Sequence, residues 1–186
     1  IGMQVGVANA DFVFGEPINL GPTVNTSGHD DGPSISADGL ELYFESTRPG
    51  GFGSWDVWVT TRVSVDDDWG EPSNLGSSVN SSDWDGAPGI SPDGLELYFS
   101  DYKVPRPGGF YDLWVTRRPT KDDPRGAPVN LGDTLNPSYW DAGPFISADS
   151  RTLFFTSTRP GGMGGPDDIW MTRRATESGP WRTPVN

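Results

Sequence analysis

Short hydrophobic segments, bounded by glycine, proline or aspartate, occur along the whole chain. The segments Leu-Glu-Leu-Tyr-Phe at 40–44 and 95–99 begin with alternating apolar and charged positions and end in an apolar run. The segments Asp-Val-Trp-Val-Thr at 56–60 and Asp-Leu-Trp-Val-Thr at 112–116 are rich in β-branched and aromatic residues. Runs of this length and composition are typical of β-strands. The pattern predicts an all-β protein built from short strands.

The same blocks of sequence recur at a nearly constant period. The segment Gly-Glu-Pro-Ile-Asn-Leu-Gly at 15–21 returns in varied form at 70–76 and 126–132, and its beginning returns at 181–186. The prolines of these segments are 55, 56 and 56 residues apart. Between them recur Pro-x-Ile-Ser, Leu-Tyr-Phe, Arg-Pro-Gly-Gly and Asp-x-Trp, with Phe replacing Tyr in the third unit.

Each period predicts four antiparallel strands. Pro-x-Ile-Ser forms strand one, and the Asp-Gly that follows predicts a tight hairpin turn, because glycine tolerates a positive φ. The third unit has Ser150 in place of that glycine. Leu-Tyr-Phe forms strand two, Arg-Pro-Gly-Gly breaks the chain, and Asp-x-Trp forms strand three. A charged loop leads to strand four. Four such strands at this period are typical of one blade of a β-propeller.

The combined pattern of Asp-Gly, Leu-Tyr-Phe, Arg-Pro-Gly-Gly and Asp-Ile-Trp resembles the PD40 repeat, the WD40-like propeller repeat of TolB-like proteins. The resemblance covers nearly the whole chain, from about residue 14 to 186. It implies a propeller fold and a periplasmic or extracellular setting. The Gly-His and Trp-Asp signatures of true WD40 blades are not in their usual places, which disfavours a eukaryotic signalling scaffold. Propellers serve many functions, so the repeat alone does not assign one.

The number of units is too small for a closed ring. We expect units at about 24–76, 79–132 and 135–186, preceded by a remnant of another blade at 1–13. Closed propellers typically have four to eight blades. The sequence therefore predicts about three blades, either as an open fragment of a longer protein or as half of a six-bladed ring. The remaining blades would come from the parent chain or from a second copy.

Composition and charge exclude several classes of function. The chain of 186 residues has 13 Lys and Arg against 26 Asp and Glu, a net charge of −13, so we expect no nucleic-acid partner. No apolar run is long enough for a membrane span, and we expect no membrane insertion. Cysteine is absent, which excludes disulfides, thiolate zinc sites and a thiol nucleophile. The 25 glycines and 18 prolines disfavour long helices.

Antiparallel blades place the loop that enters strand one and the Arg-Pro-Gly-Gly loop at the same end of the sheet, which we call the first face. Every unit has two aspartates and one arginine there. These residues could form a carboxylate ring for Ca²⁺, or Asp–Arg bridges that fasten loops. We favour the structural role, because each aspartate has its own candidate cation. The set is Asp30, Arg48 and Asp56; Asp85, Arg106 and Asp112; and Asp141, Arg159 and Asp168.

Signals for catalysis are weak. His29 is the single histidine, so a site with several histidine ligands is excluded within this chain. The sequence has no Gly-x-Ser-x-Gly elbow and no phosphate-binding loop. A feature repeated three times makes a poor unique active site. We expect no catalytic residue, no metal and no cofactor, with Ca²⁺ bound by the acidic loops as the weak alternative.

The positions that break the repeat are better candidates for ligand binding. Aromatic side chains precede the recurrent aspartates, and the second unit has an insertion before its arginine. Exposed aromatic rings beside polar groups suit sugar stacking or a protein hot spot. The simpler interpretation is that they shelter the ends of the blade core. The candidates are His29, Trp84, Tyr102, Lys103, Tyr139 and Trp140.

These observations favour a non-catalytic binding or scaffold module of a larger bacterial envelope or secreted protein, with a protein or carbohydrate ligand. The alternative is part of a propeller-based carbohydrate-active enzyme, a hydrolase or a lyase. A third interpretation is a purely structural repeat that links other domains. A central cluster of histidine, tyrosine and carboxylates would favour the enzyme, whereas a flat aromatic rim would favour the module.

Overall fold

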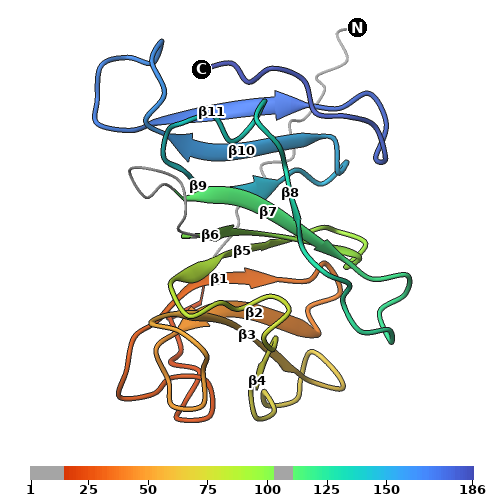
Figure 1. The fold of residues 1–186 in the computed structure, drawn as a ribbon. Coiled ribbons are helices and arrows are strands. Elements are labelled where there is room, and N and C mark those ends of the chain that lie inside the picture. Colours follow the sequence, from red (N-terminus) through yellow and green to blue (C-terminus); the bar gives the residue numbers. More distant parts are fainter. Residues whose placement is uncertain (1–14, 103–110) are drawn as a thin grey trace, which may run out of the picture.

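The computed structural model describes residues 15–102 and 111–186, which form three antiparallel β-sheets stacked face to face (Figure 1). Within these ranges there are eleven strands and no helix. The predicted blade remnant at 1–13, together with Lys103 and Arg106, lies outside them.

The three sheets have the same meander topology, and we call them blades 1, 2 and 3. Blade 1 contains β1 (Asp30–Ile35), β2 (Glu41–Ser46), β3 (Asp56–Thr61) and β4 (Ser73–Asn74). Blade 2 contains β5 (Asp85–Ile90), β6 (Glu96–Asp101), β7 (Asp112–Arg117) and β8 (Val129–Asn130). Blade 3 contains β9 (Asp141–Ile146), β10 (Thr152–Ser157) and β11 (Asp168–Arg173), and a bridge between Met171 and Val185 stands where the fourth strand would lie. The predicted all-β blade architecture is confirmed.

The pairing register is the same in every blade. Trp58 lies opposite Phe44, Trp114 opposite Phe99 and Trp170 opposite Phe155, so the three tryptophans of strand three occupy equivalent positions. Strand one bends at a bulge in each blade, where Gly32, Ala87 and Gly143 have positive φ.

The hairpin turn between strands one and two keeps its geometry where the sequence changes. Gly39 and Gly94 have φ of 74° and 77°, and Ser150 adopts the same left-handed conformation with φ of 54°. The turn is held by its own polar side chains, since Ser147 Oγ donates to Asp149 Oδ1 and accepts from the Thr152 N–H. Ser36 and Ser91 make the same contacts in blades 1 and 2, so the turn keeps one hydrogen-bond pattern with either glycine or serine.

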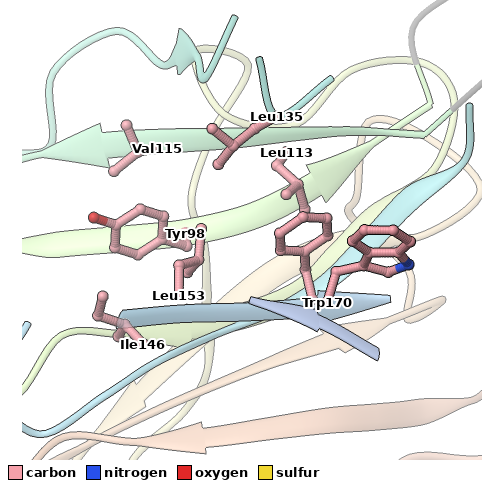
Figure 2. Close-up of a cluster of buried hydrophobic side chains, with 8 residues drawn as sticks. Tyr98, Leu113, Val115, Leu135, Ile146, Leu153 and Trp170 are labelled. Carbon is pink, nitrogen blue, oxygen red and sulfur yellow. The ribbon is translucent and has the colours of Figure 1, made fainter. Parts of the chain in front are cut away.

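The hydrophobic core lies between the blades rather than within one sheet. Tyr43 and Val57 of blade 1 pack against Ile90, Leu97 and Phe99 of blade 2. The next interface repeats this arrangement with one larger cluster (Figure 2). That cluster comprises Tyr98, Leu113, Val115, Leu135, Ile146, Leu153, Phe155 and Trp170. Each blade therefore depends on its neighbours to bury its faces.

Among residues 15–102 and 111–186 we find no helix long and apolar enough to cross a membrane.

Candidate functional site

The loops of the first face are joined to one another by backbone hydrogen bonds. The Ser54 N–H donates to the Asp83 carbonyl at 2.8 Å, and the Asp85 N–H donates to the Trp55 carbonyl at 3.0 Å. The Tyr102 N–H donates to the Trp84 carbonyl at 2.9 Å. The loop that enters strand one and the loop between strands two and three therefore lie at one end of the sheets and are connected from blade to blade.

Aromatic rings gather around Tyr111, the residue that precedes β7. Trp84 meets its ring edge-on with centroids 4.7 Å apart, and Trp140 and Tyr102 lie at 4.9 Å and 5.1 Å. We call these four residues the aromatic cluster. The structure thus brings together three of the predicted ligand-binding residues, although they come from different loops.

The outer part of the aromatic cluster is accessible to a partner. Trp140 is 44 % exposed, and Tyr139 beside it is 37 % exposed. Tyr111 is partly buried, and that burial raises the pKa of its hydroxyl, so it remains a neutral donor at physiological pH. Two broad exposed rings next to a hydroxyl form a surface suited to stacking and hydrogen bonding.

Tyr111 was not among the predicted site residues, although a signal for it exists in the sequence. It stands immediately before Asp112, as Trp55 stands before Asp56, and both aspartates are recurrent. His29 does not join the aromatic cluster. It stacks on Trp55 instead, with centroids 5.3 Å apart and ring planes 29° apart.

The recurrent arginines fasten the first face from within. Arg48 donates to Asp30 Oδ1 at 2.7 Å and to the Val24 carbonyl at 2.6 Å, and its guanidinium lies 4.7 Å from the Phe44 ring centroid. Arg159 repeats these contacts in blade 3, where it donates to Asp141 and to the Leu135 carbonyl. Each arginine ties the loop that enters strand one to the aromatic core of its blade.

The other recurrent aspartates accept hydrogen bonds from neighbouring backbone or side-chain groups. Asp56 accepts the Phe52 N–H at 2.6 Å, and Asp168 accepts the Met163 N–H at 3.1 Å. Asp112 accepts from the Asn130 side chain at 2.9 Å, and Asp85 accepts the Ser81 N–H at 2.5 Å. In the part of the chain that the structure describes, no group of three or more His, Cys, Asp or Glu residues is arranged to hold a metal ion.

Asp30 and Asp141 occupy equivalent positions, but their carboxyl pKa values are shifted in opposite directions. Burial opposes ionisation of Asp30, but hydrogen bonds from Ser46, Thr26 and Arg48 outweigh it and lower the pKa to about 2. Asp141 is fully buried because blade 2 covers it, and this desolvation raises its pKa despite its bonds to Ser157 and Arg159.

Glu45 is a buried carboxyl that the sequence did not single out. Burial raises its pKa to about 7, although the carboxylate accepts the Ala87 N–H at 3.1 Å. A raised carboxyl pKa is what a general acid requires. The equivalent residue of blade 2 is Ser100, which accepts the Gly143 N–H at 3.0 Å. Because a serine makes the same contact, Glu45 belongs to the joint between blades.

The inner strands β1, β5 and β9 line a shallow groove of mostly apolar character. Its walls include the isoleucines of the three Pro-x-Ile-Ser segments, Pro33, Pro88, and Phe145, which is 67 % exposed. No titratable side chain lines this groove.

Comparison with known proteins gave structural matches only. No family model matches the chain, and no curated protein matches it in sequence. A TolB-type protein from Agrobacterium tumefaciens superimposes with a TM-score of 0.55 at 16 % identity, covering 86 % of this chain and 49 % of that one. This chain thus spans about half the length of that relative.

Two enzymes also match. A thermostable family-43 glycoside hydrolase gives a TM-score of 0.53 at 15 % identity, over 80 % of this chain and 52 % of that one. A puromycin-hydrolyzing peptidase from Mycobacterium tuberculosis gives 0.51 at 18 % identity, over 87 % and 24 %. At such identities the likeness concerns the fold, and it shows that the three sheets are blades of a β-propeller.

Proposed function

We propose that this chain is a non-catalytic binding module that recognises a protein or polysaccharide ligand through the aromatic cluster and Tyr139. The observation that carries the proposal is the convergence of Trp84, Tyr102 and Trp140 on Tyr111. Aromatic side chains offer a large contact area with few rotatable bonds, which makes recognition entropically inexpensive. The neighbouring loops differ between blades, and unequal loops on a repeated scaffold commonly carry specificity.

The charged groups of the first face support binding rather than catalysis. Asp30 and Asp141 are each paired with an arginine, and Asp56 and Asp168 accept backbone N–H groups. Side chains engaged in this way hold loops in place. Glu45 makes the joint that Ser100 makes in the next blade, so its acidity is a consequence of packing.

We further propose a periplasmic or extracellular setting, in a larger bacterial envelope or secreted protein. The resemblance to the PD40 repeat and the fold shared with a TolB-type protein support this setting.

Substitution of the exposed rings tests the proposal. Binding of a panel of soluble polysaccharides and of envelope protein extracts would be followed by tryptophan fluorescence and by pull-down on immobilised protein. Tyr139→Ala combined with Trp140→Ala should weaken binding of the ligand identified in this screen by about 2–4 kcal/mol. The melting temperature should change little, because both rings are substantially exposed.

Phe145→Ala is the matched control, since it removes an exposed ring from the inner strand β9. It should leave binding unchanged. Equal effects of the control and of the double variant would contradict the aromatic cluster as the binding site.

A further inference from the structure

The two interfaces between blades are built from the same four contacts. In the first contact, the side chain of an asparagine forms two hydrogen bonds with the strand-three backbone of the preceding blade. Asn80 accepts the Val57 N–H at 2.8 Å and donates to the Val57 carbonyl at 3.0 Å. Asn136 makes the same pair of bonds to Leu113, both at 2.8 Å.

The second contact is an ion pair. Arg118 of blade 2 holds Glu41 of blade 1 through two hydrogen bonds of 2.9 Å and 2.6 Å. Arg174 of blade 3 holds Glu96 of blade 2 in the same way, at 3.4 Å and 2.6 Å. These guanidiniums are almost completely buried. Each therefore needs the carboxylate of the preceding blade as its hydrogen-bond partner.

The third contact packs a side chain on a tyrosine ring of the preceding blade, and the fourth is a hydrogen bond from the bulge in strand one. Arg125 of blade 2 lies over Tyr43 of blade 1, and Trp181 of blade 3 meets Tyr98 of blade 2. The N–H groups of the bulge residues Ala87 and Gly143 donate to side chains of the preceding blade, as described above.

Blade 1 presents the receiving half of this interface on its outer surface, which we call the leading face. A hollow on this face is lined by Leu20, Val24, Asn25, Leu42 and Phe44 among others. These five positions correspond in the repeat to Leu75, Val79, Asn80, Leu97 and Phe99, which surround Val57 in the first interface. Arg62 and Trp69 stack nearby with a separation of 4.4 Å, at the positions of Arg118 and Arg125.

Blade 3 presents the inserting half, which we call the trailing face. Ile169 is 73 % exposed, whereas its equivalents Val57 and Leu113 are fully buried. Phe154 is 37 % exposed, whereas its equivalents Tyr43 and Tyr98 are at most 1 % exposed.

We propose that two copies of this chain associate head to tail, with the trailing face of each copy against the leading face of the other. Ile169 enters the hollow of the partner copy, and Trp69 of that copy covers Phe154. Asn25 of that copy hydrogen-bonds to the Ile169 backbone, whose carbonyl also accepts the Asn186 side-chain amide of its own chain at 2.9 Å. The occupant is a second copy because this interface is already formed twice within the chain, and its two halves carry equivalent residues at the asparagine, ring and bulge contacts. Two such contacts give six blades, a number within the range of closed propellers, around a two-fold axis.

One of the four contacts is incomplete in this pairing. Thr152 stands where Glu41 and Glu96 stand in blades 1 and 2. Arg62 of the other copy therefore meets a hydroxyl and not a carboxylate. The contact between copies should be weaker than the contacts within the chain, and it should be strengthened by restoring the acid.

Sedimentation equilibrium over a range of protein concentrations tests the proposal. The parent chain should show a reversible equilibrium between one chain and two. Ile169→Arg should shift that equilibrium fully to single chains. Val63→Arg makes a comparable change at a residue that is 92 % exposed and makes none of the four contacts, and it should associate like the parent. Circular dichroism should show that both variants are folded.

Thr152→Glu provides a gain-of-function test. It should lower the dissociation constant by about tenfold, as a buried charge-assisted pair would. Arg62→Ala in the same chain should abolish that gain. A single chain at every soluble concentration, equal behaviour of Ile169→Arg and Val63→Arg, no gain from Thr152→Glu, or open-ended assemblies in place of pairs would each overturn the proposal.

Discussion

At the scale of the residue, one position of the repeat can carry different chemistry. Glu45 and Ser100 both accept a bulge N–H from the next blade, but only Glu45 places an ionisable group in the joint. Its carboxyl and the Trp84 ring both pack against Gly86, where a Cβ would lie 1.5 Å from Glu45 Oε2. A side chain at this position would displace the Glu45 carboxylate or the Trp84 ring.

Glu45 should make the stability of the fold dependent on pH. Its pKa is about 7 in the folded state against an ordinary glutamate value of 4.5, so the folded state binds the proton more tightly. Its stabilising contribution is complete below about pH 4.5 and is lost as the pH rises to about 7. At pH 8, Glu45→Gln should therefore raise the free energy of unfolding by about 2–3 kcal/mol, because the amide oxygen still accepts the Ala87 N–H without a buried charge.

Urea denaturation of the parent and Glu45→Gln at pH 5 and pH 8 measures this difference. The gain should be much smaller at pH 5. Glu71→Gln, at an exposed position, is the control and should change stability little at either pH. A gain that is equal at both pH values would contradict the assignment.

Residue roles on the first face were only partly predictable from the sequence. The recurrence of Asp30 and Arg48 indicated a structural pair, because one repeated residue could be matched with another. Tyr111 was not predicted, because its position at the centre of the aromatic cluster depends on Trp84, Tyr102 and Trp140 meeting around it. That convergence arises from the packing of neighbouring blades, which no local pattern encodes.

At the scale of the element, the inner strands approach closely enough to exclude a side chain. A Cβ at Gly89 would lie 2.4 Å from the Pro144 carbonyl oxygen, so β5 and β9 are in backbone contact. Gly89→Ala should force the two strands apart and lower the free energy of unfolding by about 1–3 kcal/mol. Thermal and urea unfolding would measure the loss.

Gly126→Ala is the matched control for Gly89→Ala, since its Cβ would make an ordinary contact of 3.4 Å. It should change the free energy of unfolding by much less. Equal losses in the two variants would show that glycine flexibility, and not the contact between β5 and β9, is responsible.

The strands themselves were predictable because their period, turns and composition agree with one another. The fourth strands were less predictable, because β4 and β8 are only two residues long. Such short strands contain no alternation of polar and apolar residues that could identify them. Ser150 shows a related limit. The sequence marks it as a departure, yet the hydrogen bonds of Ser147 with Asp149 and Thr152 preserve the turn.

At the scale of the whole molecule, stability should be uneven across the three blades. Blade 2 has a neighbour on both faces, and Leu97, Tyr98 and Phe99 in β6 are fully buried. Blade 3 has one face that leaves Ile169 exposed. In repeat architectures each unit is stabilised mainly by its interfaces with neighbours, so a unit with one interface opens more readily than a unit with two.

Native-state hydrogen exchange should therefore show the slowest amides in β6 and β7 and faster exchange in β11 when the protein is dilute. If two copies join head to tail, protection of β11 should rise with protein concentration while that of β6 changes little, because only the terminal faces gain a neighbour. Ile169→Arg should remove the concentration dependence. Uniform protection of all three blades in dilute solution would show that the outer faces do not need a neighbour to be stable.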